Sequence, residues 1–152
     1  MATVFDVADY ILNKKGSMTT MKLQKLCYYS QAWSLAWDEE PLFKEEFEAW
    51  ANGPVCRELF DAHKGKFRLK KSFFSKLGNA SNLTETQKAT VNAVLDYYGD
   101  WEPQELSGLT HREKPWLDAR KNVPFGENCE EIIQKEAMQQ FYGGLIATGS
   151  NA

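Results

Sequence analysis

The chain has 152 residues, of which 43% are hydrophobic and 13% aromatic, so one domain can form a packed core without a metal or a disulfide. Eighteen basic and 21 acidic residues give a net charge of −3, which argues against a dedicated nucleic-acid-binding protein, since that class carries a positive field. The odd set of Cys27, Cys56 and Cys129, without a CxxC pair, excludes a disulfide framework and favours a reducing cytoplasm.

No targeting or membrane segment is predicted. Residues 1–9 already contain two aspartates, which a secretory leader would not carry. The uncharged stretch with an apolar bias at residues 27–37 is much shorter than the roughly 20 residues that cross a bilayer. We therefore expect a cytoplasmic protein that does not enter a membrane.

Two helices are predicted at the start of the chain. Residues 4–14 place apolar side chains at helical spacing, and Gly16 ends this helix. A second helix covers residues 20–37, with Thr19 or Thr20 as its cap. Its apolar arc extends over so much of the circumference that we expect it at the centre of the fold.

The next region mixes extended and helical patterns. Residues 47–51 are predicted to be extended, with alternate side chains on one face. Gly53 and Pro54 mark a turn, and Pro54 is predicted to lie in the first turn of a helix over 54–63. Alternation over 66–70 indicates a short strand, which we expect to pair with the stretch around Phe47.

Four further helices are predicted, over residues 84–98, 103–109, 115–121 and 128–143. Thr84 and Gln87 form a capping box for the first of them, and Asn128 is the expected cap of the last, which Gly143 ends. The fold class is therefore mainly α: a single compact domain of six or seven helices over residues 1–152, with an ordered body at about 3–143 and room for one short β-hairpin.

The residues that could carry catalysis do not form a recognised pattern. His63 lies near a predicted helix end, where the helix dipole would stabilise an imidazolium, and His111 lies in a turn between two short helices. No second His or Cys stands at metal-ligand spacing, and no phosphate loop, dinucleotide fingerprint or zinc-protease motif is present. We expect no catalytic residue, metal or cofactor; the open alternative is an enzyme centred on His111 and Glu113.

The cysteines are expected to be structural. Cys27 lies on the apolar face of the second helix. Cys56 and Cys129 each stand at a predicted helix start, where the dipole can lower a thiol pKa, but no basic partner can be assigned beyond Arg57.

The chain also contains a basic run, residues 64–76, with six basic side chains, three phenylalanines and no acid. The simplest interpretation is a solvated loop with its phenylalanines packed beneath it. The alternatives are an acidic protein surface or nucleic acid as partner, and the net charge favours the protein.

Three segments, in order, resemble the Panacea-domain (SocA-like) antitoxin family, also described as phage-associated GepA-like proteins. They are residues 21–33 (MKLQKLCYYSQAW), 47–55 (FEAWANGPV) and 106–116 (LSGLTHREKPW), the last followed by Ala119-Arg120. The resemblance spans about residues 5–142. The chain departs from the pattern at Cys56-Arg57, where the family has a further apolar residue and often a proline, so its choice of partner can differ.

The resemblance implies an antitoxin of a type II toxin–antitoxin pair, often from a prophage, which binds a toxin encoded by an adjacent gene. It also implies an alternative, a proteolytic adaptor that delivers its partner to a ClpXP-type protease. Neither role requires nucleic acid.

Two of the resembling motifs suggest a partner-binding surface, provided that they meet in space. Its residues would be Glu48, Trp50, Asn52, Gly53, Pro54, His111, Glu113 and Trp116. The alternative is that the segment 110–116 is a structural clamp, with Trp116 in the core and His111 holding the turn. In that case His111→Ala would lower stability by about 1–3 kcal/mol through unpaired buried groups.

Overall fold

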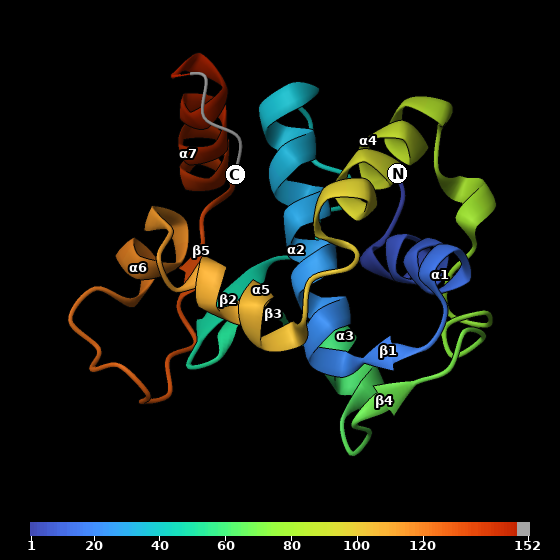
Figure 1. Ribbon diagram of the computed structural model, residues 1–152, viewed down its shortest axis with the longest axis horizontal. Helices are drawn as coiled ribbons and strands as arrows, with labels where there is room; N and C mark the ends of the chain where they lie inside the picture. The colour runs from blue at the N-terminus through green and yellow to red at the C-terminus, as the bar shows by residue number, and fades with distance from the viewer. Residues whose placement is uncertain (149–152) are drawn as a thin grey trace.

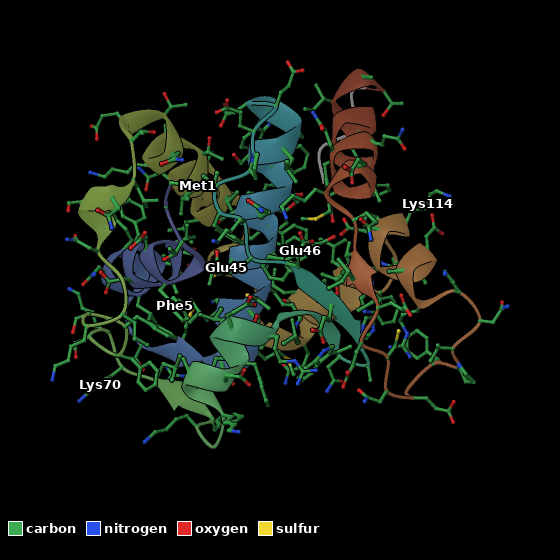
Figure 2. All side chains as sticks on the ribbon, turned by 180° about the vertical axis from the view of Figure 1, so that it is seen from behind. Met1, Phe5, Glu45, Glu46, Lys70 and Lys114 are labelled. Atoms are coloured by element: carbon green, nitrogen blue, oxygen red, sulfur yellow. The ribbon has the colours of Figure 1, made fainter. Side chains whose placement is uncertain are left out.

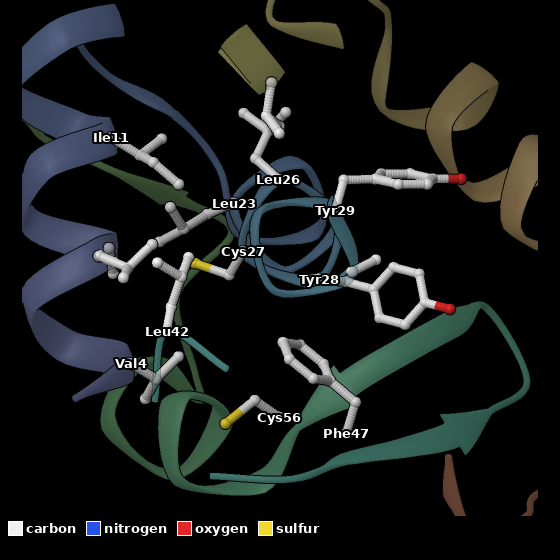
Figure 3. Close-up of a cluster of buried hydrophobic side chains, with 14 of the residues drawn as sticks. Val4, Ile11, Leu23, Leu26, Cys27, Tyr28, Tyr29, Leu42, Phe47 and Cys56 are labelled. Atoms are coloured by element: carbon white, nitrogen blue, oxygen red, sulfur yellow. The ribbon is translucent and has the colours of Figure 1, made fainter. Parts of the chain in front are cut away.

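Helix α2 (Thr20–Trp37) runs through the middle of the molecule in the computed structural model, which describes residues 1–148 (Figure 1). Every residue from Leu23 to Leu35 is buried. Figure 3 looks along this helix and shows side chains radiating from it on several sides, with Leu26, Tyr29 and Tyr28 pointing in different directions. A helix that is buried around its whole circumference is the core of the domain, as the sequence predicts.

The other helices surround α2. Helices α1 and α4 lie on one side of it and α7 on the other. Helix α5 lies near the start of α2, and α6 lies beside α7 (Figure 1). Their bounds are α1 Val4–Lys15, α3 Arg57–His63, α4 Glu85–Tyr98, α5 Pro103–Thr110, α6 Lys114–Arg120 and α7 Lys135–Ala147, with a 3-10 turn at Ala80–Asn82. Seven α-helices over residues 1–148 confirm the predicted mainly α fold.

Local capping explains why the helices begin where the sequence predicts. Thr3 and Asp6 form a capping box at the start of α1, and the Thr19 hydroxyl accepts from the backbone of Lys22 at the start of α2. Thr84 and Gln87 form the predicted box at α4.

Two small sheets complete the fold. Strands β2 (Phe47–Trp50) and β3 (Gly53–Cys56) form an antiparallel hairpin, and β5 (Ile132–Ile133) pairs with the free edge of β2. Strand β1 (Met18–Thr19) pairs with β4 (Arg68–Leu69). The hairpin packs against the start of α2 and is visible below it in Figure 3.

The predicted helix over 54–63 is wrong at its start. Residues Gly53–Cys56 form β3, and the helix begins only at Arg57. Pro54 lies opposite Ala49 in the hairpin, and the Gln24 side chain accepts from the N–H of Cys56 and donates to its carbonyl. These long-range bonds satisfy the Cys56 backbone as a further strand would, so the segment stays extended.

Two strand partners also differ from the prediction. The strand within 66–70 pairs with β1, whereas β2 pairs with β3 and β5. Ile132 and Ile133, placed by the sequence on the buried edge of the last helix, instead face Glu48 and Phe47 in the sheet. The prediction that Asn128 caps the last helix is therefore wrong.

The last helix differs at both ends. It begins at Lys135 and continues through Gly143 and Gly144 to Ala147, so the glycines do not end it as predicted. Helix α7 thus extends past residue 143, and residues 149–152 of the expected domain lie outside the described part. Within that part, no helix combines the length and apolarity needed to span a membrane.

Candidate functional site

The structure brings the two motifs of the expected binding surface together. The indole N–H of Trp116 on α6 donates to the carbonyl of Trp50 on β2 at 2.8 Å, and the Ser107 hydroxyl on α5 donates to the carbonyl of Asn52 at 2.6 Å. The Arg120 guanidinium donates to the carbonyl of Ala49 at 2.9 Å. Helices α5 and α6 therefore clamp the hairpin through its backbone.

Half of the eight expected residues are enclosed by this packing. Gly53, Pro54, Glu113 and Trp116 are buried, the last at 1% exposure. The accessible ones are Glu48, Trp50 and His111, each half-buried, and Asn52, which is exposed. In this conformation only the second set can contact a partner, and the first set supports the fold.

The accessible part of the hairpin carries a charged and aromatic cluster. The Glu48 carboxylate accepts from the Trp50 indole at 2.8 Å and from Arg57 at 3.1 Å. Arg57 also pairs with Glu130 at 3.2 Å, and its guanidinium lies 5.0 Å from the centre of the Trp50 ring. These contacts fix the Trp50 side chain, and a fixed, half-exposed tryptophan is a typical anchor of protein interfaces.

His111 and Glu113 face different groups. The His111 ring stacks on Trp116 with centroids 4.2 Å apart, hydrogen-bonds the backbone of Ala51, and leaves Nε2 without a partner. Burial, followed by the fields of Lys25 and Arg120, lowers the pKa of His111. It holds the turn between α5 and α6 against the hairpin, as the clamp interpretation expects.

Glu113 instead points into the core. Its Oε1 accepts from the hydroxyls of Tyr29 at 2.8 Å and Tyr142 at 2.7 Å. Burial raises the pKa of Glu113 to about 7, although both tyrosine bonds act in the opposite direction. Within residues 1–148 no hydrogen bond joins Glu113 to His111, and the two side chains have different partners.

The sequence missed a cavity of about 380 Å³ beside the hairpin, which we call the Lys25 cavity. Its walls come from α2, the hairpin and α3, and include Gln24, Lys25, Trp50, Asn52, Phe60 and His63. The signal in the sequence was Lys25 itself, a lysine on a helix predicted to be apolar nearly all round.

Lys25 is buried to 1% exposure, and its Nζ donates to the carbonyl of Pro54 at 3.2 Å. Burial lowers the pKa of Lys25 to about 7, and no acidic group offsets that effect. The protonated amine of Lys25 is a strong hydrogen-bond donor, and no acidic group nearby balances its charge.

His63 shares this cavity. Its Nε2 lies 3.0 Å from Nε2 of Gln24, and its pKa is lowered, chiefly by burial and also by the charge of Lys25. At the end of α3, burial and the charge of Lys25 therefore oppose the imidazolium that the helix dipole would stabilise.

The cysteines are all buried. Burial raises the pKa of Cys56 to about 12 and that of Cys27 well above its ordinary value, so neither thiol is activated by a helix start. Among residues 1–148 no group of three or more potential ligands is placed to hold a metal.

Comparison with known proteins supplies one match. A family model described as "Antitoxin SocA-like, Panacea domain" matches residues 23–117, which extend from α2 into α6 and include the hairpin and most residues that line the Lys25 cavity. Neither the curated proteins nor the solved structures contain a match.

Proposed function

This chain belongs to the SocA-like, Panacea-domain antitoxin family, and from that premise we propose that it neutralises a toxin by binding it directly. The observation that carries the proposal is the family match over residues 23–117. The toxin is expected to be the product of an adjacent gene, in a type II pair of the kind found in prophages, and binding is expected in the cytoplasm.

The geometry supports binding and not catalysis as the mode of action. His111 is occupied with Trp116 and Ala51, and Glu113 with two tyrosines, so both residues serve packing. The accessible part of the hairpin offers Glu48, Trp50 and Asn52 next to Arg57. We take this hairpin surface as the contact region, because it combines a fixed aromatic side chain with charged neighbours.

Co-expression with the neighbouring reading frame tests the proposal. The neighbour alone should arrest growth, and this chain should restore growth and co-purify with it. A harmless neighbour, or rescue without co-purification, would contradict neutralisation by direct binding.

The same assay separates binding from delivery to a protease. In a host that lacks ClpXP-type proteases, a binding antitoxin still rescues growth, whereas an adaptor does not. His111→Ala adds a test of the enzyme alternative: loss of rescue with unchanged folding and co-purification would show chemistry at that turn.

A further inference from the structure

The Lys25 cavity contains a cation that no acid of the protein compensates. Lys25 forms no ion pair within residues 1–148, and one of its three ammonium hydrogens is directed to the Pro54 carbonyl. Glu48, which lies on the same hairpin, is already engaged by Trp50 and Arg57. A buried charge without a counter-charge is costly unless something else pairs with it.

His63 lines the cavity beside Lys25. The Gln24 Oε1 accepts from the N–H of Cys56 at 2.9 Å, which fixes the amide so that its NH₂ faces Nε2 of His63. Nε2 must then accept, so it cannot donate to a ligand, and Nδ1 is buried out of a ligand's reach. The unused donors of the cavity are therefore those of Lys25.

The remaining walls are apolar. The rings of Trp50 and Phe60 lie 4.9 Å apart, and Met21 and Val55 also line the space. The volume of about 380 Å³ falls within the range of roughly 300–1,000 Å³ that is typical of ligand sites. Apolar walls around unused donors fit a group with a short aliphatic stem and a carboxylate.

The surface next to the cavity points to a protein as the source of that carboxylate. Residues 64–71, which follow His63 directly, carry five exposed basic side chains, none of which forms an ion pair in the described part of the chain. Lys70 projects away from the body in Figure 2. A free small acid would use the cavity alone, whereas an acidic protein surface would use both the cavity and this basic segment.

We propose that the Lys25 cavity receives an acidic side chain of the partner protein, whose carboxylate pairs with Lys25 while its stem packs against Trp50 and Phe60. The inference rests on the proposed function, because the partner is the toxin. It narrows that function by predicting that the toxin presents an aspartate or glutamate to this site.

A titration of the free protein tests the site without any toxin. In protein labelled with ¹³C at lysine, the Lys25 side-chain signal is identified by its loss in Lys25→Met. The probes are acetyl-Leu-Glu-Leu-amide, its Gln counterpart and sodium acetate. The Glu peptide should shift the Lys25 signal saturably and bind about tenfold or more tightly than the Gln peptide, the gain expected for a charge-assisted hydrogen bond.

Matched variants assign the effect to Lys25. Lys25→Met should weaken binding of the Glu peptide about tenfold or more, whereas Lys22→Met, on the same helix but outside the cavity, should leave it unchanged. Equal binding of the two peptides, no shift up to the solubility limit, or unchanged binding by Lys25→Met would overturn the proposal. A shift with acetate but not with the Glu peptide would also overturn it, because the ligand would then be a free small acid.

The two proposals fail separately. If the peptide titration fails while the chain still rescues growth and co-purifies with its neighbour, the antitoxin function stands and the carboxylate site falls. If the titration succeeds but the neighbour is harmless, the site stands and its source is not a toxin.

Discussion

Lys25 is the residue whose environment is most unusual. Its pKa falls from 10.5 to about 7 because the folded protein buries it. Between these values the unfolded chain holds a proton that the folded chain has released, so raising the pH favours folding. Below pH 7 both states are protonated, and the destabilisation by the buried charge is fully present.

Lys25→Met should remove this pH dependence. We expect the variant to be more stable than the wild type at pH 6 and expect the difference to shrink as the pH rises to 8.5, by at most about 1.4 kcal/mol per pH unit. Urea denaturation at several pH values measures it. If the free energies of unfolding of the two proteins changed with pH in the same way, the assignment of a buried, uncompensated amine would be contradicted.

The pKa of Glu113 predicts the opposite dependence of stability on pH, in a lower pH range. Its pKa rises from 4.5 to about 7 on folding, so between these values the folded state keeps a proton that the unfolded state has lost. The wild type should therefore lose stability as the pH rises from 4.5 to 7, by up to about 3 kcal/mol.

Glu113→Gln keeps an oxygen that can accept from Tyr29 and Tyr142 but has no charge to bury. Relative to the wild type, the free energy of unfolding of the variant should rise as the pH increases from 4.5 to 7. The difference between the two proteins should level off above pH 7. The same denaturation series measures this, and a difference that does not change with pH would show that the carboxyl is not buried as described.

At the scale of elements, the hairpin is positioned by one glycine. Gly53 has φ +115°, and a Cβ there would lie 2.6 Å from Cε of Lys25 and 2.9 Å from Oγ1 of Thr110. Both neighbours are buried, so a buried side chain must shift to admit the added methyl group. Gly65 also has a positive φ, of +87°, but no atom lies within 4 Å of its added Cβ.

Gly53→Ala and Gly65→Ala therefore separate crowding from backbone strain. Gly65→Ala should lower the free energy of unfolding by about 1–2 kcal/mol through strain alone. Gly53→Ala should lower it by about 1–3 kcal/mol more because of overpacking. Equal losses in thermal or urea unfolding would mean that α5 and α2 do not hold the hairpin as tightly as described.

The helices could be predicted from sequence because their signals are local. The Thr84–Gln87 box and the apolar arc of α2 lie within the segments that they define. Local alternation also predicts the extended stretches that form β2 and β4. The strands at Gly53–Cys56 and Ile132–Ile133 could not be placed this way, because the first depends on Gln24 and the second on β2, which are far away in the sequence. The spacing of apolar residues along the sequence carries no information about these long-range contacts.

The candidate site was predictable to a similar degree. The motif residues around Trp50 and Trp116 were identified, and they do meet. Their division into accessible and enclosed side chains was not predictable, because it depends on how α5 and α6 cover the hairpin. The Lys25 cavity was missed because three separated segments form it.

At the scale of the whole molecule, the family match contains most residues of the cavity wall. The matched residues 23–117 contain the hairpin, α3 and the basic segment 64–71, while α1 and α7 lie outside the match and cover the central helix. Although the net charge is −3, segment 64–71, which contains β4, carries five exposed basic side chains. This asymmetry favours an acidic partner surface approaching at the hairpin.

The most direct measurement is the affinity of the purified chain for the purified product of its adjacent gene, by calorimetry without any protease. The account predicts a stable complex with a Kd of about 1–100 nM, in the range typical of specific protein complexes. Trp50→Ala should weaken it by about tenfold or more, while Tyr97→Ala, which removes an exposed aromatic side chain on α4, outside the hairpin and the basic segment, should not. Absence of binding between two folded proteins, when the neighbour is toxic, would contradict neutralisation by direct contact.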